Sequence, residues 1–216
     1  MTTFSRYYED GLLHETTMNE LEELIKDESN KALIADLIYH RYYDRYLKIF
    51  DYKASESKVY VDEQGNEKVR SIFNLEYKNG FVMLASCCLL IETMASFLNG
   101  NDTTPKDGGV DAYISVFKKA FEYDNELKIF RNETIYGSIR CAILHQGEIK
   151  DGFKIRRTGK LFEDKTINAN EFLKSLKMYL KSYCDDLSNP DTEWDGDLWE
   201  KCKSKLVCII TNTKNI

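Results

Sequence analysis

Proline, glycine and histidine are scarce in this sequence. Its 216 residues contain two prolines, eleven glycines and three histidines. So few chain breakers favour long helices over many short strands. Six cysteines are present, but no CxxC pair occurs, so we expect neither a structural zinc site nor any other metal or cofactor. The cysteines lie in apolar runs and instead predict buried, reduced thiols.

Three further absences limit the classes of function. No GxSxG, Walker A or HExxH motif occurs, so the common signatures of serine hydrolases, P-loop NTPases and zinc proteases are missing. The N-terminal segment lacks the apolar core of a secretory signal, which predicts a cytoplasmic protein. The net charge of −6 excludes a uniformly basic protein that coats nucleic acid, although it is compatible with a local basic patch.

The hydrophobic pattern predicts one mainly α-helical domain over residues 1–216. A capping box at Thr17–Glu20 begins the first helix. Apolar residues at helical spacing predict further helices at about 30–50, 80–98, 110–123, 133–146, 168–188 and 194–210. Two β-hairpins are expected as small insertions within residues 58–72 and 153–164, and a polar loop at 101–109.

The run Gly80–Leu98 carries a single charge, Glu92, and is long enough to span a bilayer. The glutamate, the small polar residues and the lack of a basic cluster on one flank favour a buried core helix, with no membrane association. An ionised carboxylate in such a helix is costly unless it is paired. Glu92 therefore forms an ion pair across the bundle, belongs to a functional cleft, or lies at an exposed helix edge.

Arg140 and His145 are the residues with the clearest chemical potential. Arginine holds a phosphate through two hydrogen bonds, and histidine changes protonation near neutral pH. Together they can promote attack of an RNA 2′-hydroxyl on the adjacent phosphate without a metal. On an ideal helix the two side chains point about 140° apart, and they converge only if the helix ends near His145, as Gly147 predicts. The alternative is a surface arginine and a histidine that interacts with the carbonyls at the helix end.

The residues around this pair resemble a known family. The run from Ile135 to Glu148, IYGSIRCAILHQGE, resembles the RxxxxH segment of the HEPN superfamily. It is particularly similar to bacterial members in which such a string precedes a GFKI-type strand. The upstream run Leu89–Phe97 resembles the preceding core helix of that superfamily, in which an acidic or polar residue faces the motif. The resemblance covers about residues 30–188, and its specific part is the motif string.

The resemblance implies a helical up-and-down bundle that forms a homodimer through its motif helices. Catalytic members cleave RNA without a metal, in a cleft at the two-fold axis. Carried over to this chain, Arg140 binds and polarises the scissile phosphate, His145 transfers the proton, and Glu92 orients Arg140 or the second motif. We therefore expect a ribonuclease that serves as a toxin or phage-defence effector and is restrained by an inhibitory protein partner.

Two alternatives to the nuclease remain. Active members often carry Asn or Asp directly after the arginine, whereas this chain has Cys141. This departure favours a noncatalytic binding or scaffold module with the same fold. The other alternative is a helical domain unrelated to the superfamily, in which Arg140 and His145 are spaced by coincidence.

A basic segment follows the motif and predicts a path for RNA. Against one acid, Asp151, it contains Lys150, Lys154, Arg156, Arg157 and Lys160. The alternative is an ordinary solvated hairpin. Phe153 and Phe162 have the chemistry to stack on bases, but their alternation with charged residues favours anchoring of the hairpin.

Overall fold

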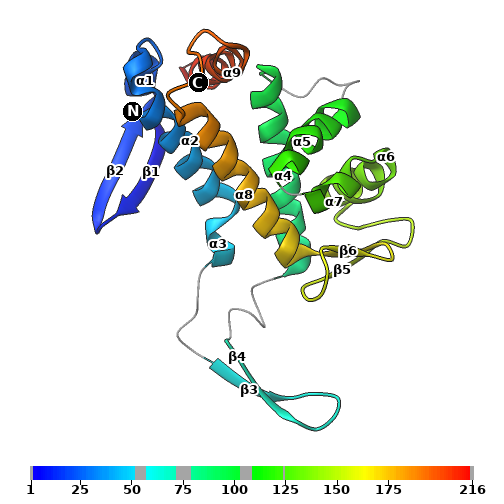
Figure 1. The fold of residues 1–216 in the computed structure, drawn as a ribbon. Helices are drawn as coiled ribbons and strands as arrows, with labels where there is room; N and C mark the ends of the chain where they lie inside the picture. The colour runs from blue at the N-terminus through cyan, green and yellow to red at the C-terminus, as the bar shows by residue number, and fades with distance from the viewer. Residues whose placement is uncertain (1, 52–56, 72–78, 103–108, 124, 215–216) are drawn as a thin grey trace.

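The computed structural model describes residues 2–51, 57–71, 79–102, 109–123 and 125–214. Over these residues the protein is mainly helical, as the sequence predicts, with small β-sheets at the edges of the helical body (Figure 1). The long helices are α2 (Lys31–Tyr46), α4 (Gly80–Asn99), α5 (Gly109–Tyr123), α8 (Ala169–Ser188) and α9 (Asp197–Lys214).

Helix α8 lies across the centre of the body, in contact with α2, α4 and α5 (Figure 1). Its cap is Asn168, whose side chain accepts hydrogen bonds from the amides of Asn170 and Glu171. Aromatic rings fill the space beneath it. Phe172 lies 4.6 Å from Phe130 between ring centroids. Since both rings are buried, α8 joins the helical body chiefly through apolar packing.

Helix α4 is the one helix of the described residues with the length and hydropathy to cross a membrane. Its most apolar 18-residue window has a mean hydropathy of 2.0, and 56% of that window is buried inside the protein. The helix contacts α2, α5, α8 and α9. Its apolar residues therefore belong largely to the core, as the sequence predicts.

The N-terminal segment forms a β-hairpin that the sequence analysis did not predict. Strands β1 (Thr3–Glu9) and β2 (Leu12–Thr17) pair antiparallel around a turn at Asp10 and Gly11, whose φ angles are 48° and 79°. Such a turn needs positive φ at both positions, and Asp-Gly provides it. Helix α1 (Met18–Leu24) follows with the predicted capping box between Thr17 and Glu20.

The helix predicted at 30–50 is two helices. Helix α2 ends at Tyr46, and a short α3 (Lys48–Asp51) follows after Leu47. The break turns both Leu47 and Phe50 into the core. The first predicted hairpin is confirmed as β3 (Ser57–Val61) paired with β4 (Glu67–Ser71), and it projects away from the helices (Figure 1). Most of the predicted polar loop, residues 103–108, lies outside the described residues.

The second predicted hairpin is wrong. Strands β5 (Lys154–Arg156) and β6 (Phe162–Glu163) both exist, but they do not pair with each other. A third strand, β7 (Thr166–Asn168), lies between them, parallel to β5 and antiparallel to β6. The sequence gives little indication of β7, because a strand of three residues is too short for alternation to be visible.

Candidate functional site

The segment that carries Arg140 and His145 is helical over the predicted span, but its middle is not an α-helix. Helix α6 (Glu133–Ile135) leads into a π-helical turn (Tyr136–Cys141), and α7 (Ala142–Gln146) completes the segment. We call these three elements the motif helix. Single π turns inside helices occur frequently at functional sites. Here the π turn contains Arg140.

The chain after the motif helix folds back and fastens the π turn. The hydroxyl of Ser138, a buried residue in that turn, donates a hydrogen bond to the carboxylate of Asp151. The amide of Lys150 donates to the carbonyl oxygen of Ser138 at 3.0 Å. Both bonds join residues more than ten positions apart, so the π turn is held by tertiary contacts that a helical pattern alone does not reveal.

Gly147 ends the motif helix as predicted. Its φ is +69°, in the left-handed region, and its amide donates to the carbonyl oxygen of Ile143 at 3.0 Å. We expect Gly147→Ala to lower the free energy of unfolding by about 1 kcal/mol, because a Cβ strains this conformation. Urea unfolding of the purified protein measures the change.

The matched control is Gly137→Ala, in the π turn of the same helix. Gly137 does not have a positive φ, and a Cβ there meets nothing within 4 Å. Alanine at this position should raise the free energy of unfolding, by at most about 1 kcal/mol. Equal destabilisation by both variants would contradict the assigned role of Gly147.

Arg140 forms an ion pair with Glu92 of α4. Its Nε donates to Glu92 Oε1 at 2.7 Å, and the two side chains are 15% and 18% exposed. Three environments were predicted for Glu92, and the structure shows the first of them, an ion pair between two helical segments of the bundle. Burial acts to lower the pKa of Arg140, but its hydrogen bonds to Glu92 and Cys141 outweigh burial and raise that pKa. Arg140 is therefore a firmly charged cation.

Two further groups of the π turn surround the guanidinium. The Cζ atom of Arg140 lies 5.2 Å from the centroid of the Tyr136 ring, which suits a cation–π contact. Its Nη1 lies 3.6 Å from the Sγ atom of Cys141. Burial and a hydrogen bond to Cys141 raise the pKa of Tyr136 to about 12. The arginine is thus oriented from three sides before any ligand arrives.

His145 lies in the last turn of α7 and is exposed to solvent. Over the described part of the chain it has no hydrogen bond and no ion pair. The structure therefore keeps Arg140 and His145 on one short helix, with the helix end where it was predicted, but a single copy of the chain does not join the two side chains by a hydrogen bond.

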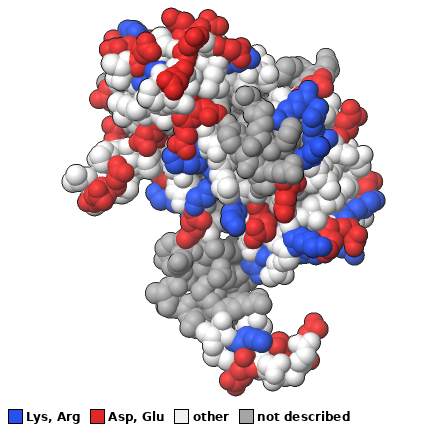
Figure 2. Space-filling view, in the orientation of Figure 1, with Lys and Arg blue, Asp and Glu red and all other residues white. Residues whose placement is uncertain are grey.

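The five basic residues after the motif do not behave alike. Lys150, Lys154 and Lys160 are exposed, whereas Arg156 and Arg157 are half-buried. Glu163 accepts from Lys160 at 2.8 Å and from Arg156 at 3.4 Å, and these two cations, Lys160 first, hold the pKa of the Glu163 carboxyl below its ordinary value. Acidic and basic side chains are interspersed over the face drawn in Figure 2. A shared carboxylate thus reduces the net positive charge that this segment offers to RNA.

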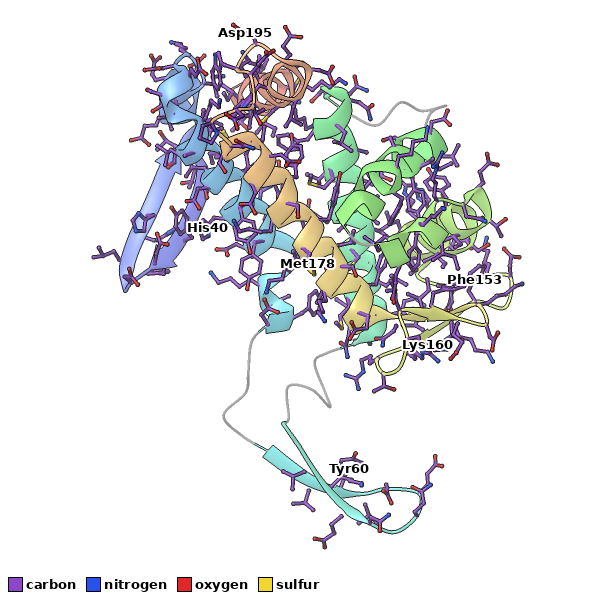
Figure 3. The ribbon with its side chains drawn as sticks, in the orientation of Figure 1. His40, Tyr60, Phe153, Lys160, Met178 and Asp195 are labelled. Carbon is purple, nitrogen blue, oxygen red and sulfur yellow. The ribbon has the colours of Figure 1, made fainter. Side chains whose placement is uncertain are left out.

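The two phenylalanines of this segment are structural. Phe153 is 8% exposed, and its ring centroid lies 6.4 Å from that of Phe162. Phe162 in turn meets Phe130 edge to face at 5.9 Å. Figure 3 shows Phe153 beside the three-stranded sheet. The rings pack against the core as anchors, although of a three-stranded sheet rather than of the predicted hairpin, and stacking on a base would require Phe153 to leave the core.

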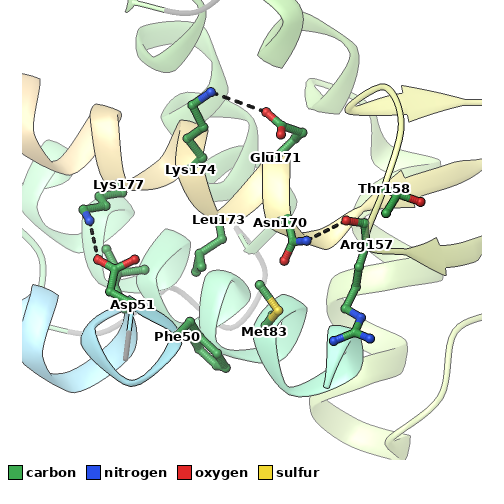
Figure 4. A pocket seen from close by; sticks show the side chains of 11 residues that line it. Phe50, Asp51, Met83, Arg157, Thr158, Asn170, Glu171, Leu173, Lys174 and Lys177 are labelled. Atoms are coloured by element: carbon green, nitrogen blue, oxygen red, sulfur yellow. Dashed lines mark hydrogen bonds and ion pairs between the residues drawn. The ribbon is translucent and has the colours of Figure 1, made fainter. Parts of the chain in front are cut away.

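A groove of about 640 Å³ has a lining that includes no residue of the motif helix. Its apolar lining residues are Leu47, Phe50, Met83 and Leu173, and Figure 4 shows the last three. Ion pairs line its rim, between Lys177 and Asp51 and between Lys174 and Glu171. Among the candidate residues only Arg157 lines it; Arg140 and His145 do not. The groove therefore gives no support to an active site at the motif.

A cluster that was not predicted from the sequence contains the other two histidines. Tyr7 of β1 stacks on His14 at 5.0 Å and on His40 of α2 at 3.6 Å, and its hydroxyl donates to Asp36 at 2.9 Å. Figure 3 shows His40 on α2 near this hairpin. Burial and the Asp36 carboxylate raise the pKa of Tyr7 to about 12. The Asp10-Gly11 turn could have revealed part of the cluster, because it sets Tyr7 opposite His14.

No grouping of three or more metal-ligating side chains occurs within the described residues. Comparisons with known proteins leave the family open as well: no family model, no curated protein and no solved structure matches the chain. The HEPN assignment therefore remains a prediction that rests on the motif residues of the sequence.

Proposed function

We propose that this chain is a metal-independent endoribonuclease of HEPN type, which acts in the cytoplasm as a homodimer. The observation that carries the proposal is the ion pair between Glu92 and Arg140. It holds a charged, half-buried guanidinium in a π turn, five residues before an exposed histidine at the helix end. The six free cysteines agree with a reducing compartment.

In the proposed reaction His145 removes the proton of an RNA 2′-hydroxyl, and the 2′-oxygen attacks the adjacent phosphorus. The bond between phosphorus and the 5′-oxygen breaks, and the imidazolium returns its proton to the leaving oxygen. Arg140 neutralises the charge that develops on the phosphoryl oxygens. The products are a 2′,3′-cyclic phosphate and a 5′-hydroxyl end. No step of this reaction requires a metal or a cofactor.

A partly apolar face around the ion pair supports dimerisation through the motif helices. On α4, Leu89 is 44% exposed and lies about one helical turn before Glu92, and Val82 is 53% exposed about two turns nearer the start of the helix. On the motif helix, Tyr136 and Leu144 are half-buried. Exposed apolar surface of this kind marks interaction sites. A second copy would cover it and bring two motifs together.

We expect Leu89→Arg to weaken the homodimer at least about tenfold, because it introduces a charge into the apolar face. Sedimentation equilibrium measures the association. The control is Val207→Arg on α9, where the replaced side chain is similarly exposed, at 48%. A dimer that survives Leu89→Arg unchanged would exclude this face as the interface.

Cleavage of end-labelled RNA by the purified protein in EDTA tests the nuclease. Products with 2′,3′-cyclic phosphate ends would support it. Such an enzyme needs restraint in its own cell, so the proposal includes an inhibitory protein partner and a role as a toxin or phage-defence effector. The basic residues from Lys150 to Lys160 would guide the RNA strand.

One observation favours a second candidate, a noncatalytic binding module of the same fold. Arg140 is already engaged by Glu92 and contacts Cys141, which stands where active members often have Asn or Asp. These contacts leave fewer donors for a phosphate. If a folded dimer cleaves none of several RNA substrates, the binding module becomes the better conclusion.

A further inference from the structure

A second cavity, distinct from the groove of Figure 4, lies between α2, α4 and α9. Its volume is about 250 Å³. Three cationic side chains line it, and one carboxylate, Glu92, reaches it from α4. The cations are Arg41 and Arg45 of α2 and Lys205 of α9. Because Glu92 is already paired with Arg140, the lining carries an excess of positive charge.

Arg41 is the most unusual member of this lining. It is 8% exposed, its Nη1 donates to the carbonyl oxygen of Phe4, and its Cζ lies 4.4 Å from the centroid of the Phe4 ring. Within the described residues it has no carboxylate partner, and its buried Nε has no hydrogen-bond acceptor. Burial lowers the pKa of Arg41. Burial of a guanidinium without an anion raises the free energy of the folded protein. A bound anion would offset that cost.

The other groups of the cavity add donors around Arg41. Arg45 is exposed and has no ion-pair partner among the described residues. Lys205 donates to the carbonyl oxygen of Asp102, and burial lowers the pKa of Lys205 more than Asp102 raises it. The hydroxyl of Tyr46 lies 3.4 Å from that of Thr93 at the same cavity, and the Thr93 hydroxyl donates to the carbonyl oxygen of Leu89 at 3.0 Å. Cations and hydroxyls are the donors that a phosphoryl group requires.

We propose that this cavity binds the phosphoryl group of a small phosphate monoester. Arg41 supplies the buried charge, Arg45 closes over the anion from the solvent side, and the Tyr46 hydroxyl completes the donor set. The volume suits a phosphoryl group with a small attached moiety rather than a nucleic-acid strand. The site uses neither Arg140 nor His145, although Glu92, the partner of Arg140, borders it.

Calorimetric titration of the full chain with inorganic phosphate and with adenosine 5′-monophosphate tests the site, with adenosine as the uncharged control. The informative variant is Arg45→Gln, because Arg45 is exposed and its replacement does not disturb the core. The matched control is Arg131→Gln, an exposed arginine outside the cavity. For each anion, we expect the wild type and Arg131→Gln to have the same dissociation constant. For Arg45→Gln, we expect that constant to be about tenfold higher.

Three outcomes would overturn the proposal. The first is no binding of either anion to the wild type up to about 10 mM. The second is equal binding by Arg45→Gln and the wild type. The third is displacement of the bound anion by a short RNA that has no terminal phosphate, if binding of that RNA is also weakened by Arg45→Gln. This result would assign the cavity to backbone phosphodiesters. The first two results leave cleavage in EDTA untouched, so the two proposals can fail separately.

Discussion

Replacing His145 with alanine is expected to reduce RNA cleavage in EDTA by about 100-fold to 10,000-fold, because the reaction loses its proton-transfer group. Replacing Arg140 with alanine should reduce it by about 100-fold to 1,000-fold through loss of charge stabilisation. Initial rates on end-labelled RNA measure both effects. Since His145 is exposed and has no partner in the described structure, His145→Ala should leave the free energy of unfolding nearly unchanged.

Two substitutions away from the motif helix are the controls. His14→Ala removes a histidine from the β1–β2 hairpin, and Arg131→Gln removes an exposed arginine. Both should cleave RNA at the wild-type rate. If His145→Ala also cleaves at that rate, the activity belongs to other residues or to a contaminating nuclease, and the assignment of the motif is wrong.

Glu92→Gln is expected to lower the free energy of unfolding by about 2 kcal/mol, because it leaves the largely buried Arg140 without its counter-charge. The pair is 18% and 15% exposed, so solvent screens it only partly. Denaturant unfolding of the wild type and the variant measures the difference. The same variant should lower cleavage less than Arg140→Ala does, because Glu92 orients the guanidinium without touching the RNA.

A double-mutant cycle isolates the interaction. Arg140→Gln alone and the Glu92→Gln/Arg140→Gln double variant complete it, and we expect a coupling energy of about 1–3 kcal/mol between the two positions. The double variant should be more stable than the sum of the single changes predicts, since it contains no unpaired charge. Strict additivity would mean that the 2.7 Å contact contributes nothing to folding.

Much of the helical fold could be predicted from the sequence. Helices α4, α5 and α8 begin and end within two residues of their predicted limits, because their apolar runs are long and capping residues or glycines mark their ends. The β1–β2 hairpin escaped although its Asp10-Gly11 turn is a local signal. The other elements that escaped are short or depend on tertiary packing. Strand β7 has three residues, and the break at Leu47 exists because two side chains turn into the core.

The candidate site was predictable in identity but not in arrangement. The sequence alone determined which residues have the chemistry, namely a glutamate in an apolar helix and an arginine and a histidine five positions apart before a glycine. These are properties of residue type and local spacing.

Tertiary structure decided that Glu92 pairs with Arg140, that Arg140 lies in a π turn fastened by Asp151, and that His145 remains exposed. It also brought Arg41 and Lys205 to one cavity from opposite ends of the chain. Such contacts depend on how helices cross in space, and hydrophobic periodicity specifies which face of a helix is buried but not which polar groups meet there.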